Sequence, residues 1–521
     1  MNIAAIATAP GTGGIAVIRL SGPDAFTITD RIFRARNRNK TVSTAEAYTM
    51  LFGNIVDEIT DNRVQSTDND NDVEMQRTAS ATSEATQNSS PKLGEVSKTE
   101  GYVNSQLSIL NSQLVDEVVI SVFRAPHSFT GENTVEISCH GSVYIQQEIL
   151  RLLIAAGARM ANPGEFTQRA FLNGRLDLSQ AEAVADLINA QSAAAHTIAL
   201  NQMRGNFSSK LEELRRQLLH FVSLLELELD FGDHDDLEFA DRTELNAVAE
   251  AIRSQLSRLQ QTFSQGNAIK NGIPVAIVGE TNAGKSTLLN LLVGDNRAIV
   301  SDIHGTTRDV IEDTVNINGL TFRFIDTAGI RQTSDIIENM GIERTYEMIE
   351  RAQIILWVVD STNVTEHIEW LAERIMRRTE GKRLIILLNK VDRLNDEELT
   401  TLRDWFEPYK TTVNRQNTIL EISAKQSINT EQLTRLLYES AQMPDLSSGD
   451  IIISNLRHYE ALTHALESID RVIDGLQMNI PADFVAQDIR EALFHLAEIT
   501  GGEITTDEVL GNIFAHFCIG K

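Results

Sequence analysis

The sequence contains only two cysteines, Cys139 and Cys518, among 521 residues. Cysteines so few and so far apart cannot form the disulfide framework of a small secreted domain, so a reducing compartment is favoured. No uninterrupted apolar run is long enough to span a bilayer, and residues 1–19 lack the basic leader and apolar stretch of a signal peptide. We therefore expect a cytoplasmic protein without integral membrane association.

Basic residues are also scarce, since 46 Lys and Arg stand against 73 Asp and Glu and the formal net charge is -27. Binding to nucleic acid depends largely on cations that neutralise phosphates. The composition therefore argues against unaided binding of nucleic acid over a broad surface. A local basic patch, or a basic partner protein, remains compatible with the sequence.

One stretch, residues 279–287, reads Gly-Glu-Thr-Asn-Ala-Gly-Lys-Ser-Thr between an apolar run and an apolar helical segment. This is the form G-x-x-x-x-G-K-[ST] in a strand-loop-helix context. The glycines let the backbone approach an anion, Lys285 faces phosphate oxygens, and Ser286 supplies a hydroxyl for Mg²⁺. Glycine-rich turns before helices also arise for packing, so the other motifs decide between a phosphate-binding loop and a plain turn.

Four further motifs follow in order, several of them at the ends of predicted strands. A threonine of the first can complete an Mg²⁺ shell, Asp326 can hold Mg²⁺ through water, and the Gly329 N–H can contact a γ-phosphate. The Asp392 carboxylate can accept two hydrogen bonds from the N1–H and N2–H₂ edge of guanine, which adenine lacks. Each motif alone could be an ordinary turn, but together they predict a guanine-nucleotide site. The motifs are Gly305-Thr306-Thr307-Arg308-Asp309, Asp326-Thr327-Ala328-Gly329, Asn389-Lys390-Val391-Asp392 and Ser423-Ala424-Lys425.

Two residues of this region differ from a simple Ras-like switch. Ile330 follows Gly329, where a Ras-like protein carries the glutamine that orients the attacking water. Glu338 is the candidate for that role, although it could also be a solvated loop carboxylate. Asn282, inside the phosphate loop, could bind a monovalent cation that neutralises charge as an arginine finger does.

The rest of the chain predicts several domains. Near the N-terminus, β-like runs and helical patterns indicate an α+β domain interrupted by a low-complexity insertion. Ser179 and Glu182 have capping-box spacing, and long amphipathic helices follow, forming either an intramolecular bundle or a dimer surface. Strand-like runs then alternate with helices as in a parallel α/β sheet, and a second helical part lies beyond it. The predicted strands of that sheet are 275–278, 320–325, 354–359, 384–388 and 418–422.

These motifs, with several others, resemble the MnmE (TrmE) family of tRNA-modification GTPases, in the TrmE-Era-EngA-like superfamily. The resemblance runs from residue 3 to 521, with the insertion 61–113 as its main departure. Beyond the phosphate loop and residues 305–309, it rests on residues 9–14 and 18–22, Ser-Phe-Thr-Gly-Glu at 128–132, residues 163–173, and Phe-Cys-Ile-Gly-Lys at 517–521.

The resemblance implies a multidomain protein with an inserted Ras-like α/β P-loop GTPase domain. The expected parts are a tetrahydrofolate-binding and dimerisation domain at 1–173, an α-helical bundle domain at 174–270 and 441–521, and the G domain at 271–440. Arg19, Glu136, Arg175 and Lys521 are expected to contact a folate. Arg175 stands where some relatives have lysine, and Thr12 where they have arginine.

For the nucleotide site, the resemblance implies Mg²⁺ on Ser286 and Thr307, and a catalytic Glu338. K⁺ is expected on Asn282, Ser301, Ile303 and Thr306, and Cys518 is expected to have a functional role. The motifs and the resemblance together predict GTP contacts from Asn282, Ala283, Gly284, Lys285, Ser286, Thr287, Ser301, Asp302, Ile303, His304, Gly305, Thr306, Asp326, Thr327, Ala328, Gly329, Asn389, Lys390, Asp392, Ser423, Ala424 and Lys425.

The reaction that the resemblance implies is a K⁺-dependent GTPase cycle in the bacterial cytoplasm. A homodimer would join an MnmG-type flavoprotein, which uses FAD and NADH, in a heterotetramer that holds the tRNA. A 5-formyl or 5,10-methylene tetrahydrofolate would supply one carbon of the aminomethyl or carboxymethylaminomethyl group at C5 of the wobble uridine, position 34. The alternatives are a regulatory GTPase switch in ribosome assembly or signalling, and a folate carrier or sensor. A pure switch has no need of a folate-like N-terminal domain or of Phe-Cys-Ile-Gly-Lys at 517–521.

Overall fold

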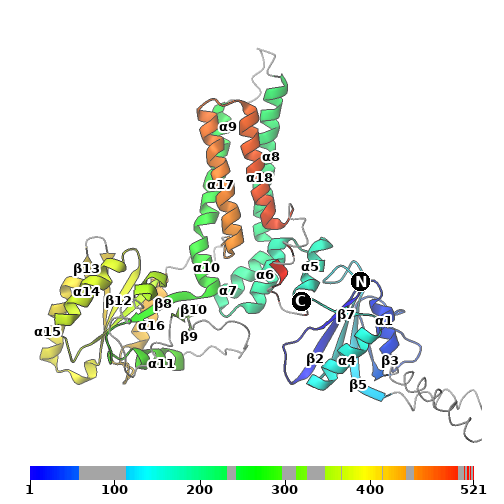
Figure 1. Cartoon of the computed structure of the whole chain (residues 1–521), viewed down its shortest axis with the longest axis horizontal. Coiled ribbons are helices and arrows are strands. Elements are labelled where there is room, and N and C mark those ends of the chain that lie inside the picture. The colour runs from blue at the N-terminus through cyan, green and yellow to red at the C-terminus, as the bar shows by residue number, and fades with distance from the viewer. Residues whose placement is uncertain are drawn as a thin grey trace, which may run out of the picture. The chain divides into compact units, whose positions relative to one another are not determined.

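The computed structural model describes residues 1–57, 113–231, 242–295, 313–325, 346–364, 366–412, 415–441 and 451–502, with 510, 513–515, 517 and 520. The predicted insertion 61–113 falls, except for its last residue, outside the described residues. The chain forms two compact units, residues 1–181 with 504–521 and residues 182–503. Figure 1 labels their helices and strands.

Within the described part of the first unit, the strands form one sheet in the order β3-β4-β5-β6-β2-β1-β7. Neighbouring strands are antiparallel except β1 and β7, which are parallel. Residues 7–12 connect β1 to β2. The strands are β1 (Ile3–Ile6), β2 (Gly13–Ser21), β3 (Phe33–Ala35), β4 (Thr49–Asp57), β5 (Gln113–Phe123), β6 (Thr134–Gly141) and β7 (Arg159–Met160).

The core of this unit lies between the sheet and two helices, α1 (Ala25–Ile32) and α4 (Val143–Ala155). Side chains alternate between the two faces of a strand, so Ile18 and Leu20 of β2 enter this core and Arg19 lies on the other face. There α5 (Glu165–Leu172) packs Phe166 against β1. The sequence thus places Arg19 outside the main core.

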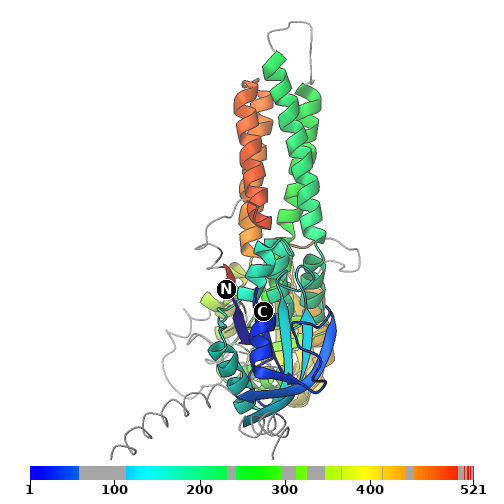
Figure 2. The same cartoon turned by 90° about the vertical axis from the view of Figure 1, so that its right-hand side faces the viewer.

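The helices α8, α9, α17 and α18 of the second unit lie side by side (Figures 1 and 2) around one apolar core. The sequence repeats an apolar residue every three or four positions at 211, 214, 218, 221, 225 and 229, and the first five of these enter the core, which confirms the intramolecular bundle. The side chain of Leu229 lies outside the described residues. No helix in the described residues is long and apolar enough to cross a membrane. The helices are α7 (Ala193–Met203), α8 (Asn206–Phe231), α9 (Arg242–Gln261), α10 (Phe263–Asn271), α17 (Leu456–Gln477) and α18 (Ala482–Thr500).

The same unit contains a sheet in the order β15-β12-β11-β8-β10-β9, parallel except for β9. Its central strands are apolar on both faces because helices cover both. The five predicted strands are confirmed within one or two residues, whereas β9 was not predicted. The elements are β8 (Ile273–Val278), α11 (Lys285–Asp295), β9 (Asp313–Ile317), β10 (Leu320–Phe324), β11 (Ile354–Asp360), α14 (Glu366–Arg378), β12 (Arg383–Asn389), α15 (Asp396–Phe406), β15 (Thr418–Ile422) and α16 (Thr430–Ser440), with the short pair β13 (Thr411–Thr412) and β14 (Arg415–Gln416).

Helix α6 (Leu178–Asn189) corrects one prediction. The capping box is formed by Asp177 and Gln180: the Gln180 N–H donates to Asp177 Oδ1 over 2.9 Å, and the Asp177 N–H donates to Gln180 Oε1 over 3.0 Å. The Ser179 and Glu182 spacing was therefore misread as the box, because Glu182 is needed elsewhere.

Glu182 is buried and binds two neighbouring residues of α17. Arg457 donates to both carboxylate oxygens over 2.9 Å, and His458 Nε2 lies 2.7 Å from Oε2. Burial alone would raise the pKa of Glu182, but His458 and Arg457 outweigh that effect and lower it from 4.5 to about 2. Arg457 also donates to the carbonyls of Glu498 and Ile499, so this cluster joins α6, α17 and the end of α18.

We predict that Glu182→Gln destabilises the bundle by about 3 kcal/mol at neutral pH, because it leaves the half-buried Arg457 guanidinium without its carboxylate. Because the pKa of Glu182 is lowered in the folded state, its ionised form stabilises the fold. This stabilisation is fully present above the ordinary pKa of 4.5 and is lost as the pH falls toward about 2. The difference from wild type should therefore shrink below pH 4.5. Urea unfolding followed by helix circular dichroism measures it.

The control is Glu226→Gln, which removes the carboxylate of the exposed pair that Glu226 forms with Arg490. It should cost less than about 1 kcal/mol. An equal cost for the two variants, or a Glu182→Gln effect that does not vary with pH, would contradict this account.

Candidate nucleotide-binding site

The loop between β8 and α11 requires glycine at both ends. Gly279 has φ +149° and Gly284 has φ +102°. Residues other than glycine rarely adopt these backbone angles. A Cβ at Gly279 would lie 2.1 Å from the Val358 carbonyl oxygen, and one at Gly284 would lie 2.2 Å from Asn389 Nδ2. The glycines therefore let the loop pass against the neighbouring strand ends.

Lys285, the first residue of α11, lies with its ammonium against this loop. Nζ donates to the carbonyls of Gly279 over 2.8 Å and Glu280 over 2.6 Å. Burial lowers the pKa of Lys285, while the Glu280 carboxylate opposes that effect. The first N–H groups of a helix have no acceptor within the helix and carry partial positive charge. The loop thus brings a cation and a helix N-terminus together, which suits a phosphate.

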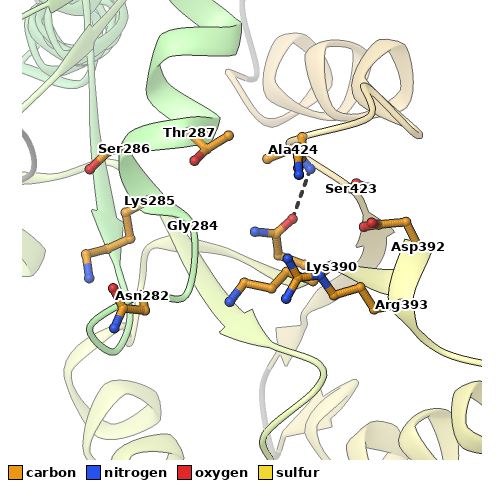
Figure 3. Close-up of a pocket in the computed structure, with 12 residues that line it drawn as sticks. Asn282, Gly284, Lys285, Ser286, Thr287, Lys390, Asp392, Arg393, Ser423 and Ala424 are labelled. Atoms are coloured by element: carbon orange, nitrogen blue, oxygen red, sulfur yellow. Dashed lines mark hydrogen bonds between the residues drawn. The ribbon is translucent and has the colours of Figure 1, made fainter.

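Asn389, at the end of β12, links this loop to the one that follows β15. Its Nδ2 donates to the Ala283 carbonyl over 2.7 Å, and its Oδ1 accepts from the Ala424 N–H over 3.0 Å, the dashed line in Figure 3. The side chain is only 3% exposed. Asn389 therefore holds the two loops in place and would position a ligand only through them. The Asn-Lys-Val-Asp motif alone does not reveal this role. We call these two bonds the Asn389 link.

The next residue, Lys390, pairs with Asp360 at the end of β11 over 2.5 Å. Burial would raise the pKa of Asp360, but hydrogen bonds from Lys390 and Thr362 outweigh it and lower the pKa below its ordinary value. Sequence reasoning missed Asp360, although its place at a strand end was a signal. Asp392 is exposed and faces the same hollow.

These residues line one pocket of about 280 Å³. Asn282 and Lys285 stand on the side of the phosphate loop, and Asp392 stands on the other side (Figure 3). Arg393 also lines it and was not predicted. The lining is Asn282, Gly284, Lys285, Ser286, Thr287, Asn389, Lys390, Asp392, Arg393, Ser423, Ala424 and Lys425.

The structure therefore brings together the predicted contacts of the phosphate loop, of residues 389–392 and of residues 423–425. Ala283 does not line the pocket, but its carbonyl accepts from Asn389. The other predicted nucleotide, cation and catalytic residues lie outside the described residues. They are Ser301, Asp302, Ile303, His304, Gly305, Thr306, Thr307, Asp326, Thr327, Ala328, Gly329 and Glu338.

A second cluster of predicted residues lies in the first unit. Arg19 donates to Glu136 Oε1 through Nε over 2.9 Å and Nη2 over 2.7 Å. Both of these bonds end on Oε1. The guanidinium lies 5.5 Å from the ring centre of Phe129 and 5.6 Å from that of Phe166, and it donates to the Gly520 carbonyl over 3.2 Å.

The remaining predicted residues of that cluster are less well defined by the structure. Arg175 is exposed, lies beside Gly131, and makes no hydrogen bond to Arg19 or Glu136. Cys518 and Lys521 lie outside the described residues, although Gly520 between them is described and packs against β1. The arrangement offers a carboxylate, a guanidinium and the exposed ring of Phe129 to one ligand, while the ring of Phe166 is buried.

Two family models match this chain. The MnmE helical domain matches residues 178–518, and the GTP-binding protein TrmE N-terminus matches residues 2–88 and 75–175. Among solved structures, Era in complex with MgGDPNP and nucleotides 1506–1542 of 16S ribosomal RNA is 28% identical over 37% of this chain and 65% of that chain, with a TM-score of 0.26. That overlap is too partial to support an argument.

Curated relatives match from end to end and carry the name tRNA modification GTPase MnmE. The protein of Parabacteroides distasonis is 53% identical over 520 residues, with all of both chains covered. Those of Bacteroides fragilis and Flavobacterium johnsoniae are 50% and 44% identical, each covering 100% of this chain and 99% of the relative. The chain belongs to the MnmE family of tRNA modification GTPases.

Proposed function

We propose that this protein hydrolyses GTP in the modification of tRNA and that the pocket binds the guanine nucleotide. One observation carries the proposal: the Asn389 link holds a phosphate-binding loop and the Asp392 carboxylate on opposite sides of one pocket. A carboxylate accepts from the N1–H and N2–H₂ edge of guanine, whereas adenine presents an unprotonated N1 there. The site therefore favours guanine.

The residues at the other end of the pocket suit a triphosphate. Lys285 and the N-terminus of α11 supply positive charge, and the Gly279 and Gly284 positions leave room for an anion near the backbone. Ser286, with Thr307, would hold Mg²⁺, which neutralises phosphate charge when bound. Lys285 exchanges its loop carbonyls for phosphate oxygens when the nucleotide enters.

Asn282 is the residue proposed to make hydrolysis depend on K⁺, together with Ser301, Ile303 and Thr306. Its φ of +64° is a left-handed conformation that asparagine tolerates better than most residues. An amide oxygen is a suitable ligand for a hard cation. Since Ile330 replaces the usual glutamine, Glu338 is proposed to orient the attacking water.

The Arg19 cluster is proposed to bind a tetrahydrofolate derivative in the 5-formyl or 5,10-methylene form, with Arg175 and Lys521 as further contacts. A pterin presents adjacent N–H groups that donate to a carboxylate, and both Arg19 bonds end on Glu136 Oε1, which leaves Oε2 for the pterin. The exposed ring of Phe129 offers an apolar face, and the buried ring of Phe166 supports the Arg19 guanidinium. These residues fit the group.

The wider reaction is proposed from the family resemblance. A homodimer would work with an MnmG-type flavoprotein, with FAD and NADH, in a heterotetramer that adds an aminomethyl or carboxymethylaminomethyl group at C5 of the wobble uridine. Cys518 would take part in this chemistry. The reaction would take place in the bacterial cytoplasm. The four-part division at residues 173, 270 and 440 also stays a proposal, since the compact units divide at 181 and 503.

Deleting the protein should remove the C5 group from the wobble uridine, and liquid chromatography with mass spectrometry of tRNA nucleosides measures this. The wild-type chain should restore the group. Glu338→Ala should bind GTP, hydrolyse it slowly and fail to restore it. Unchanged nucleosides in the deletion strain would refute the function, and full restoration by Glu338→Ala would refute the role of that glutamate.

GTP turnover should be at least about tenfold faster in K⁺ than in Na⁺, because a fitting cation stabilises transition-state charge. Asn282→Ala should bind GTP but lose this preference. Asn479→Ala is the control, since Asn479 is also left-handed, with φ +54°, and lies in the turn between α17 and α18. Equal rates in the two salts for wild type would rule out the cation proposal.

A further inference from the structure

Residues 31–40 form the most basic segment of an acidic protein. They contain five of its 46 lysines and arginines, and no Asp or Glu occurs from residue 31 to 45. Their side chains, Arg31, Arg34, Arg36, Arg38 and Lys40, are all exposed. The segment begins in α1, passes through the edge strand β3, and continues into the connection to β4.

The connection that presents these cations is held from several sides. The Arg36 N–H donates to the Phe52 carbonyl over 2.9 Å. Asp30 accepts from the N–H groups of Val42 over 2.7 Å and Ser43 over 3.0 Å. Arg124 donates to the carbonyls of Ser43 and Ala45, each over 2.7 Å. The loop is therefore a fixed platform for its side chains.

Three of these cations, Arg36, Arg38 and Lys40, have no acidic partner among the described residues. Asp30, the nearest acid before the segment, is committed to the loop backbone. Cations on an edge strand often serve only to prevent strand pairing. Here, however, the three lie beyond the strand, on the held loop.

Aromatic side chains stand beside the cations. Tyr48 is 67% exposed and Phe52 is 43% exposed, and the Arg36 guanidinium lies 5.8 Å from the Phe52 ring centre. Tyr48 has the unusual φ of +60° and is held there by bonds from its N–H to the Val122 carbonyl and from its hydroxyl to the His127 carbonyl. Strained exposed residues that the surroundings hold in place often serve binding.

We propose that Arg36, Arg38, Lys40, Tyr48 and Phe52, here the β3–β4 patch, bind the tRNA substrate. The cations neutralise phosphates, and the rings stack on unpaired bases, the two interactions by which proteins bind single-stranded RNA regions. The inference rests on the proposed function for its substrate. A second copy of the chain fits less well, because a two-fold interface would place these cations against themselves.

The test measures binding of fluorescent unmodified tRNA to the full chain by anisotropy, at 50 to 200 mM KCl. Replacing Arg36, Arg38 and Lys40 together by glutamine should weaken binding about tenfold at low salt and reduce the salt slope by about two. The control replaces Arg377, Lys410 and Arg435, exposed cations that pair with carboxylates, by glutamine. It should bind like wild type.

Two further variants separate charge from stacking. Replacing both Arg36 and Arg38 by lysine should leave the salt slope at the wild-type value, because the number of cations is unchanged. Phe52→Leu should weaken binding about tenfold and leave the slope unchanged, since it removes only a ring. Circular dichroism and GTP turnover establish that each variant is folded, and neither should change.

Equal tRNA binding by the glutamine variant and wild type, or no tRNA binding by wild type at 50 mM KCl, would overturn the proposal. So would a changed molar mass of the glutamine variant in light scattering, which would indicate a contact between copies. The proposed function fails separately: if the deletion strain keeps its modified uridine while the patch still binds RNA, only the reaction is refuted.

Discussion

The Asn389 link is the interaction on which the candidate site depends most. One side-chain amide joins the loop after β8 to the loop after β15, and its own place at the end of β12 sets where Lys390 and Asp392 follow. Because the amide is buried, each lost bond would leave an unsatisfied polar group. The distance between the phosphate end and the base end of the pocket is thus fixed by the protein itself.

Around this link, each part of the chain contributes a different physical element. The parallel sheet brings strand ends to one edge, and α6 is joined to the bundle by the buried Glu182 and His458 and the half-buried Arg457. The first unit carries the Arg19 cluster on the face of its sheet away from the main core. It also carries a basic loop, so a net charge of -27 does not exclude RNA from that one surface.

Local patterns predicted much of this structure, because strands buried on both faces and a period of three to four in α8 leave clear signals. The phosphate loop and the order of the motifs likewise predicted every pocket-lining residue except Arg393. The Asn389 link, the Asp360 pair and the use of Glu182 were missed, since each joins residues distant in sequence. Strand β9 was missed because it is a short edge strand whose pairing, rather than its composition, defines it.

The central claim is that guanine nucleotide binds where the Asn389 link holds the phosphate loop. Calorimetric titration of GDP into Gly284→Ala tests it, because the added Cβ would lie 2.2 Å from Asn389 Nδ2. Gly294→Ala is the control, since its Cβ would meet nothing within 4 Å on the same helix. The account predicts at least about a hundredfold weaker binding for Gly284→Ala alone, from the loss of about 3 kcal/mol. Equal affinity of the two variants would contradict it.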